Sequence, residues 1–292
     1  MQSVDLLAGQ AHRQVVNVER PPRILVFDSG LGGLTVFREL VKARPDASFI
    51  YVADDAAFPY GTWAEDALRQ RLLSVMDGLV ARHRPDCVVI ACNTASTLVL
   101  PALRQAHALP FVGTVPAVKP AAEMSRSGMV SILATPGTVA RDYTRTLIER
   151  FAGTCLVTMV GSARLASLAE ADMRGEVVDD SDILAEIIPC FVESEIRGAR
   201  RRTDVVTLSC THYPLLLDRF RRLAPWPVTW IDPAPAIARR MLQIVGPVPA
   251  NAWQGKASEG EASASFTSGE PALRLRETLS RFGIDDVMAG PR

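Results

Sequence analysis

Two stretches, VVIACNTAS at residues 88–96 and VVTLSCTHY at residues 205–213, decide the fold. Each reads as a short apolar strand that ends in a cysteine and continues into polar residues. Apolar runs of this length between helical patterns are typical of parallel strands covered on both faces. The repetition predicts two related lobes, one built around each cysteine.

The segments around these stretches alternate in the same way. We predict strands at residues 23–28, 48–53, 86–91, 129–134, 154–160, 204–208 and 228–231. We predict helices at residues 34–43, 64–82, 95–107, 139–150, 163–173, 181–198, 214–223, 235–245 and 271–282. This is an α/β fold of two pseudo-symmetric lobes, each a mostly parallel sheet flanked by helices. We expect the active site in the cleft between the lobes, at the carboxyl ends of the strands.

The second lobe is expected to interrupt the first along the chain. Residues 22–115 plus 228–292 form the first lobe, which carries Asp28 and Cys92. Residues 116–227 form the second, which carries Cys210. Residues 1–21 read as an extension, and residues 246–264, rich in Gly, Ala and Ser, as a mobile loop.

The composition excludes several classes of protein. Hydrophobic residues make up 48% of the 292 residues and charged residues 22%, the profile of a folded chain. Lys+Arg and Asp+Glu are both 32, so no basic excess points to nucleic acid, and the run Arg200–Arg201–Arg202 reads as a solvated turn. We find no apolar stretch that could span a bilayer and no signal peptide, and expect a cytoplasmic protein.

Five cysteines are spread along the chain, an odd number that argues against a disulfide framework. Cys87, Cys155 and Cys190 lie in apolar segments and read as core residues. Cys92 and Cys210 each follow a strand where a helix is predicted to begin, and a thiol at a helix N-terminus ionises more readily. A single such cysteine is more often a small core residue, but two at matching positions favour proton transfer.

Polar residues directly follow both cysteines. Asn93, Thr94 and Thr211 can bind a carboxylate or can cap a helix, and the two roles are compatible. His212 could hold Cys210 as a thiolate or carry its proton. A Cys-x-His pair could also be half of a metal site, but the sequence has no second pair at ligand spacing, so we expect no metal.

Two further segments can contact a ligand. FDSGLGGL at residues 27–34 joins a strand to a helix, so its glycines either let the backbone approach an anion or simply permit a tight turn. PYG at residues 59–61 is a turn in which Tyr60 could offer its hydroxyl and Gly61 its N–H group.

Taken together, FDSGLGGL at 27–34, PYG at 59–61, ACNTAS at 91–96 and CTHYPLL at 210–216 resemble the glutamate racemase family of the aspartate/glutamate racemase superfamily. The resemblance covers about residues 23–241, with a fainter match at SFTSGE, residues 265–270. It implies racemisation of free glutamate without pyridoxal phosphate or metal. It also implies a role in supplying D-glutamate for bacterial peptidoglycan.

Inversion of a stereocentre by proton transfer needs one group on each face of the α-carbon, and a preorganised polar pocket that stabilises the carbanionic transition state. The resemblance implies that Cys92 takes the proton from D-glutamate and Cys210 takes it from L-glutamate. It assigns the ammonium group to Asp28 and Ser29, with Asp28 also tuning Cys92. The remaining roles go to Asn93, Thr94 and Thr211 as hydrogen-bond donors, Tyr60, Gly61 and Thr138 as substrate-binding residues, His212 as the assistant of Cys210, and Glu170 as the acidic partner of His212.

The chain departs from the family pattern at Ser209, where Gly is usual, and at Ala53, Asp55 and Ala57, where Gly, Thr and Arg are common. Rate and affinity are therefore more in question than the type of reaction. Three alternatives stay open: a racemase of aspartate or another amino acid, a decarboxylase using one cysteine, and a non-catalytic binding or regulatory protein on this scaffold. Glutamate is the expected partner, and the family resemblance also suggests a homodimer.

Overall fold

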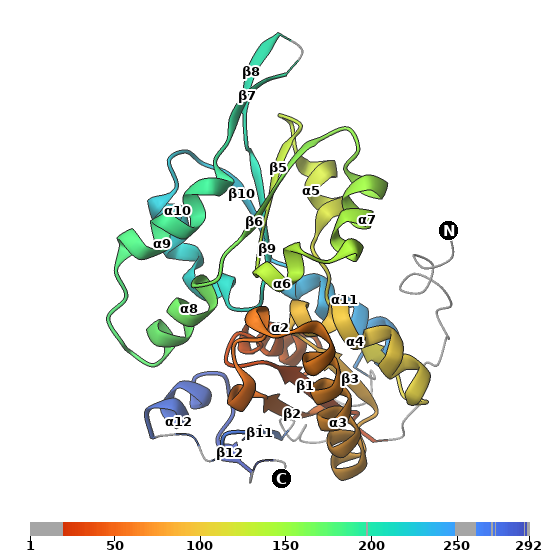
Figure 1. Cartoon of the computed structure of the whole chain (residues 1–292). Helices are drawn as coiled ribbons and strands as arrows, with labels where there is room; N and C mark the ends of the chain where they lie inside the picture. The colour runs from red at the N-terminus through yellow and green to blue at the C-terminus, as the bar shows by residue number, and fades with distance from the viewer. Residues whose placement is uncertain are drawn as a thin grey trace. The chain divides into compact units, whose positions relative to one another are not determined.

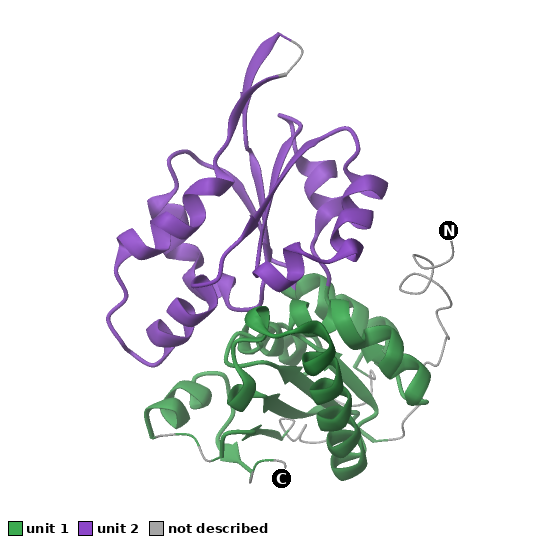
Figure 2. Ribbon diagram, in the orientation of Figure 1, with its two compact units in different colours: residues 1–114, 234–292 green, residues 115–233 purple. Residues whose placement is uncertain are grey.

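The computed structural model describes residues 20–196, 198–248, 261–269, 271, 273–288 and 290. The chain divides into two compact units, residues 1–114 with 234–292 and residues 115–233 (Figure 2). Each unit contains one parallel sheet flanked by helices, so the predicted α/β class is confirmed. The predicted extension at residues 1–21 lies almost wholly outside the described residues.

Unit 1 is built on a six-stranded sheet in the order β12-β11-β2-β1-β3-β4, with parallel pairing throughout (Figure 1). The strands are β1 Arg23–Asp28, β2 Ser48–Ala53, β3 Cys87–Ile90, β4 Phe111–Val112, β11 Ala262–Phe266 and β12 Asp286–Val287. The helices are α2 Leu34–Ala43, α3 Glu65–His83, α4 Asn93–Ala106, α11 Ala234–Val245 and α12 Leu273–Ser280, with short 3₁₀ turns η1 Asp55–Ala57 and η2 Tyr60–Thr62.

The apolar character of β1 explains its central place. Five of its six residues are buried, because helices cover both faces of the sheet. Leu25 and Phe27 belong to the same core as Leu72 of α3 and Val99 of α4, and α2 packs against α11 (Figure 1). This packing fixes the carboxyl ends of the strands, where the candidate site lies.

Unit 2 is built on a four-stranded parallel sheet in the order β10-β9-β5-β6. The strands are β5 Met129–Ala134, β6 Leu156–Gly161, β9 Val205–Ser209 and β10 Thr229–Ile231. Around them lie α5 Val118–Met124, α6 Pro136–Val139, α7 Asp142–Phe151, α8 Leu165–Met173, α9 Asp180–Ile187 and α10 Leu217–Leu223, with 3₁₀ turns η3 Ile188–Cys190 and η4 Tyr213–Leu216. Val118, Ile132 and Leu147 join α5, β5 and α7 in one core.

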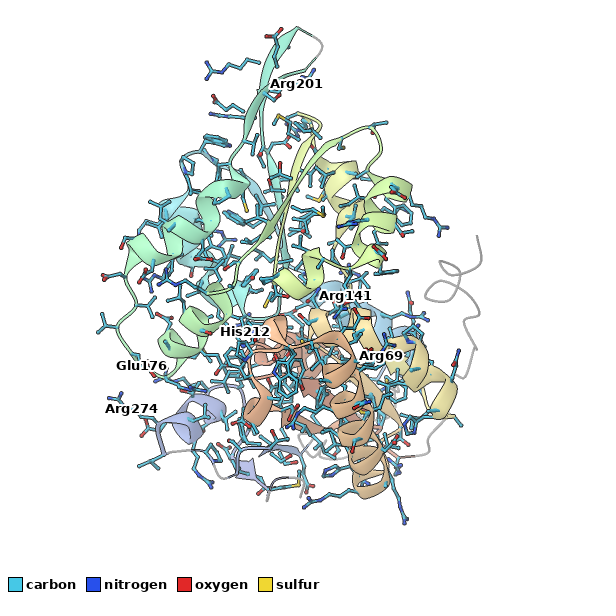
Figure 3. The ribbon with its side chains drawn as sticks, viewed as in Figure 1. Arg69, Arg141, Glu176, Arg201, His212 and Arg274 are labelled. Carbon is cyan, nitrogen blue, oxygen red and sulfur yellow. The ribbon has the colours of Figure 1, made fainter. Side chains whose placement is uncertain are left out.

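The helix predicted at residues 181–198 is wrong beyond α9. Pro189 lies in η3 and cannot continue an α-helix, because proline lacks the N–H group that the helix needs. The chain then forms an antiparallel hairpin of β7 Glu193–Ile196 and β8 Ala199–Arg202 (Figure 1). The predicted turn at Arg200–Arg202 is therefore a strand, and Figure 3 labels Arg201 on this hairpin.

The loop predicted at residues 246–264 is also wrong in part. Residues 249–260 lie outside the described residues, but β11 begins at Ala262 and pairs in parallel with β2. Alternating Ala and Ser have little intrinsic preference for a strand, so the sequence pattern did not predict β11. Pairing with β2 buries Ala264, Ser265 and Phe266.

Two smaller corrections concern boundaries. The predicted helix at 139–150 is divided into α6 and α7, because Arg141 has an extended backbone. The first lobe does not resume at residue 228, because β10 pairs with β9 and belongs to unit 2.

Candidate active site

In unit 1, polar side chains gather where neighbouring strands end. Asp28 pairs with Ala53, and Ala53 pairs with Phe266, so the carboxyl ends of β1, β2 and β11 are level. The next residues along β2 and β11 are Asp54 and Thr267. Carboxylates and hydroxyls therefore meet at one edge of the sheet.

Cys92 lies at this edge, as the N-cap of α4 with an extended backbone. Cys92 is 6% exposed. The helix α4 begins at the next residue, which confirms the predicted start of a helix after this cysteine. Asn93 is 1% exposed, and among the described residues neither Nδ2 nor Oδ1 of its amide has a hydrogen-bond partner. Capping does not explain Asn93, because the helix has no side-chain cap. A buried amide without a partner is costly, and a bound ligand would satisfy it.

The connection between β1 and α2, residues 29–33, brings the start of the helix close to Asp28. Asp28 is fully buried, and its Oδ2 accepts a hydrogen bond from the N–H of Gly30 at 3.1 Å. Tyr51 donates its hydroxyl to the carbonyl of Gly30 at 2.5 Å. A Cβ on Gly33 would lie 2.5 Å from Cβ of Asp28, closer than real contacts allow. Gly33 therefore lets α2 begin directly against Asp28. Ser29 and Thr94 are also buried at this edge.

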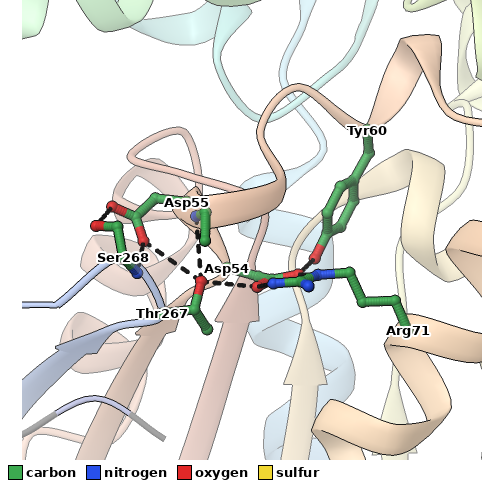
Figure 4. A network of polar contacts seen from close by, with 7 residues as sticks. Asp54, Asp55, Tyr60, Arg71, Thr267 and Ser268 are labelled. Carbon is green, nitrogen blue, oxygen red and sulfur yellow. Dashed lines mark hydrogen bonds and ion pairs between the residues drawn. The ribbon is translucent and has the colours of Figure 1, made fainter. Parts of the chain in front are cut away.

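Asp54 is the centre of a polar network that the sequence did not predict (Figure 4). Arg71 of α3 donates to both carboxylate oxygens, from Nη2 at 2.6 Å and from Nε at 2.7 Å. Tyr60 donates its hydroxyl to Oδ2 at 2.5 Å, and Thr267 donates to Oδ1 at 2.7 Å. The hydroxyl hydrogen of Tyr60 is thus already engaged, and the half-buried Gly61 follows in the same 3₁₀ turn.

The charges of this network follow from the contacts. Burial by itself raises the pKa of Asp54, but hydrogen bonds from Arg71, Tyr60 and Thr267 outweigh it and hold that pKa below its ordinary value. Burial and the neighbouring Asp54 raise the pKa of Tyr60 well above its usual range. Tyr60 is therefore a neutral hydrogen-bonding group at physiological pH.

In unit 2, Cys210 follows β9 directly, and Ser209 at the end of β9 pairs with Ala134 of β5. The Sγ atom of Cys210, 6% exposed, lies 3.7 Å from Nδ1 of His212. The other ring nitrogen, Nε2, lies 2.9 Å from Oε1 of Glu170 in α8. Glu170 and His212 are 2% and 1% exposed (His212 is labelled in Figure 3). The predicted acidic partner of His212 is therefore in contact with it.

Burial by itself lowers the pKa of His212. Hydrogen bonds to Cys210 and Glu170, together with their charges, outweigh burial and raise that pKa well above its usual range. An imidazolium in this position places positive charge 3.7 Å from Sγ of Cys210. The arrangement provides a thiol with a histidine that can hold or return its proton.

The remaining predicted residues of unit 2 lie at the same edge. Thr211 is buried, with Oγ1 3.5 Å from Nδ1 of His212. Thr138 is fully buried in α6 after β5, and its Oγ1 lies 3.1 Å from Oγ1 of Thr135. The helix predicted at 214–223 is wrong at its start, because η4 with Pro214 precedes α10. Cys210 therefore lacks the α-helix N-terminus that Cys92 has, and His212 is its partner instead.

Two of the other cysteines are inert for an evident reason. Burial raises the pKa of Cys87 to about 12 and the pKa of Cys190 to about 12. Both are core residues, as predicted, whereas Cys155 is half-buried. Within the part of the chain that the structure describes, no three His, Cys, Asp or Glu side chains are grouped as metal ligands, and no helix is long and apolar enough to cross a membrane.

A model of the Asp/Glu/Hydantoin racemase family matches residues 26–241 of this chain. The chain belongs to that family. It is 53% identical over 267 residues to the glutamate racemase of Brucella canis, covering 91% of this chain and 93% of the relative. It is 54% identical to the glutamate racemase of Brucella anthropi, covering 92% of this chain and 94% of the relative.

A solved structure gives the same result for the fold. The Escherichia coli glutamate racemase, in complex with L-glutamate and the activator UDP-MurNAc-Ala, matches with a TM-score of 0.80 and 38% identity. The match covers 91% of this chain and 97% of that chain. The resemblance drawn from the four motifs is thereby confirmed.

Proposed function

We propose that this chain interconverts L-glutamate and D-glutamate by proton transfer at the α-carbon, with Cys92 and Cys210 as the two acid/base groups. Cys92 removes the α-proton of D-glutamate, and in the reverse direction it delivers a proton to that same face of the intermediate. Cys210 has the corresponding two roles on the opposite face, that of L-glutamate. The observation that carries this proposal is a thiol at the carboxyl edge of each parallel sheet, each beside polar groups suited to proton transfer or carboxylate binding.

The surroundings of the thiols suit their roles. The unpartnered, buried amide of Asn93 can bind a substrate carboxylate beside Cys92. The buried carboxylate of Asp28 suits the ammonium group. Hydrogen bonds of this kind, already in place, stabilise negative charge that develops in the transition state. We assign the same substrate-binding role to Ser29, Tyr60, Gly61, Thr94, Thr138 and Thr211.

The reaction balances without a cofactor in this proposal. One thiolate takes the α-proton, and the opposite thiol delivers a proton to the other face of the carbanion, so the enzyme ends with the two protonation states exchanged. His212 stabilises the thiolate form of Cys210, and Glu170 holds His212 in place. We further propose that the product serves peptidoglycan synthesis in the cytoplasm and that the enzyme is a homodimer.

The first test follows L-glutamate and the purified protein in deuterated water without added cofactor, recording optical activity and α-proton exchange together. Loss of both signals with formation of D-glutamate is the expected result. Exchange without inversion would mean that one cysteine does not act as a base. A substrate panel follows, in which a strong preference for aspartate would replace glutamate in this proposal. A silent protein that still binds glutamate by calorimetry would favour the non-catalytic alternative.

A further inference from the structure

We propose that Arg174 is a positioning residue for the racemisation, acting on Cys210 through Glu170 and His212. The inference rests on the proposed function for its activity readout. It adds a fourth member to the series Cys210, His212 and Glu170, and this member reaches the surface, with 48% of its side chain exposed.

The position of Arg174 follows from the helix. Glu170 lies in α8, and Arg174 is the C-cap of that helix, with its N–H group bonded to the carbonyl of Glu170 at 3.0 Å. Residues four apart lie on the same face of a helix, and Glu before Arg is the favourable order. Nη2 of Arg174 accordingly lies 2.9 Å from Oε2 of Glu170.

The two oxygens of the Glu170 carboxylate therefore have different partners. Oε2 accepts from Arg174, and Oε1 lies 2.9 Å from Nε2 of His212. Arg174 thus fixes the rotation of the carboxylate that presents Oε1 to the imidazole. It also supplies positive charge to a carboxylate that is almost completely buried, where the ionised form is otherwise disfavoured.

Other charged groups on the elements packed against α8 are engaged elsewhere. Glu186 and Asp182 of α9 bond to Ser162 and Arg164. Asp172 of α8 pairs with Arg219, which with Arg222 also binds Asp180. Tyr213 of η4 interacts with Cys210, and burial raises the pKa of Tyr213 well above its usual range. Arg174, in contrast, binds Glu170 directly.

In Arg174→Ala the buried Glu170 carboxylate loses the positive charge beside Oε2 and keeps His212 beside Oε1. Burial then favours the protonated form of Glu170 at a higher pH than before. A neutral Glu170 supports the His212 imidazolium less well, so His212 is a weaker proton partner for Sγ of Cys210. The loss should therefore grow as pH falls and shrink as pH rises.

The experiment measures kcat/KM for L-glutamate against pH in the full-length wild type, Arg174→Ala and Arg174→Lys. The acidic limb of the Arg174→Ala profile should move to higher pH, with a loss of about threefold to tenfold on that limb. Arg174→Lys should recover part of the shift because it keeps the charge. Arg164→Ala removes a similarly exposed arginine paired with Asp182 and should follow the wild type.

Glu170→Gln provides the coupling test. If Arg174 acts through Glu170, Arg174→Ala in the Glu170→Gln background should cause no further shift, because the carboxylate it positions is gone. A loss in Arg174→Ala that is equal at all pH values would indicate a merely structural role and would overturn the inference. A profile identical to wild type would also overturn it.

A second readout does not depend on racemase activity. Iodoacetamide labelling, resolved by mass spectrometry of the Cys92 and Cys210 peptides, reports the nucleophilic reactivity of each cysteine. Arg174→Ala should slow labelling of Cys210 about threefold on the acidic limb and leave Cys92 within about twofold of wild type. Equal slowing of both peptides, or none at Cys210, would reject the role of Arg174. Inactive wild-type protein with this labelling pattern would instead reject the proposed function alone.

Discussion

Thr267 donates its hydroxyl to Oδ1 of Asp54 at 2.7 Å, although the two residues are 213 positions apart. The same Oγ1 accepts from the N–H of Ala56 at 3.1 Å, and Ser268 bonds to Asp55 beside it (Figure 4). The end of β11 is thereby fastened to the turn that follows β2. We expect this junction to hold the Tyr60 turn in place, because Asp54 also binds Tyr60.

Thr267→Val should weaken that junction, because valine keeps the shape but neither donates nor accepts a hydrogen bond. We expect a loss of about 1–2 kcal/mol in the free energy of unfolding, or about 2–3 °C in Tm for a chain of this size, measured by circular dichroism. Thr146→Val is the control, since the hydroxyl of this half-buried residue donates to the carbonyl of Asp142 in its own helix and joins no second segment of the described chain. Equal Tm values for the two variants would show that the junction is not stabilising.

Arg71→Ala should destabilise the fold in a pH-dependent way. Removal of the Arg71 side chain should lower the free energy of unfolding by about 2 kcal/mol at pH 7, because the buried Asp54 carboxylate loses its positively charged partner. The folded-state pKa of Asp54 is depressed, so the stabilisation is present above the unfolded pKa and is lost as pH falls through the folded value. The difference in the free energy of unfolding between wild type and Arg71→Ala, measured with urea, should therefore become smaller below about pH 4.

Arg69→Ala on the same helix is the matched control. Arg69 pairs with Glu65 at the surface, and such pairs contribute roughly 0.5 kcal/mol or less. If the difference in the free energy of unfolding between wild type and Arg71→Ala stays constant from pH 7 to pH 3, the stabilisation does not come from the Asp54 carboxylate.

Cys92→Ser and Cys210→Ser should each reduce turnover by at least about a hundredfold, because general acid–base groups contribute on that scale. Both variants should keep the wild-type circular dichroism spectrum. Cys155→Ser is the control, a half-buried cysteine outside the candidate site, and should stay within about twofold of wild type. Near-normal racemisation by either active-site variant would defeat the two-base mechanism.

Gly33→Ala should reduce activity by roughly tenfold or more and destabilise the fold by about 1–3 kcal/mol. The added Cβ would press on Asp28 at 2.5 Å and on the hydroxyl of Tyr51 at 2.9 Å. Gly78→Ala is the contrasting variant, because a Cβ there meets nothing within 4 Å and alanine suits the interior of α3. It should raise Tm slightly and leave kcat unchanged. Similar losses in both would show that contact with Asp28 is not the cause.

Dialysis against a chelator should leave the activity intact, since proton transfer between thiols and carbon needs no metal in the proposed mechanism. The measurement compares initial rates before and after exhaustive dialysis, with total metal quantified. Restoration of a lost rate by an added divalent ion would refute this expectation.

The buried parallel strands could be predicted closely from the sequence. The bounds of β1, β2 and β5 and of α2 match the prediction, because their apolar runs are covered on both sides. The hairpin β7–β8 could not be predicted, since its residues are mostly polar and exposed and its two strands pair with each other outside the main sheet. The identity of β11 depended on pairing with a strand near the other end of the chain.

Some residues of the candidate site could likewise be predicted from the sequence, and others could not. Cys92 and Cys210 could be found because each follows an apolar strand with a polar motif attached. The Glu170–His212 pair joins residues 42 positions apart, and only the family resemblance suggested it. Arg71 and Thr267 carried no local signal, because only the fold brings them to Asp54.

The order of the strands along the chain has a consequence for synthesis. Unit 2 is one continuous segment, so β5, β6, β9 and β10 can pair while the ribosome is still translating. Unit 1 emerges first but is completed last, because β2 gains its outer neighbour only when residues 262–266 appear. Until then β2, with the apolar sequence SFIYVA, is an open edge able to join other nascent chains. Chaperone demand should therefore be greatest in the interval between the synthesis of β2 and of β11.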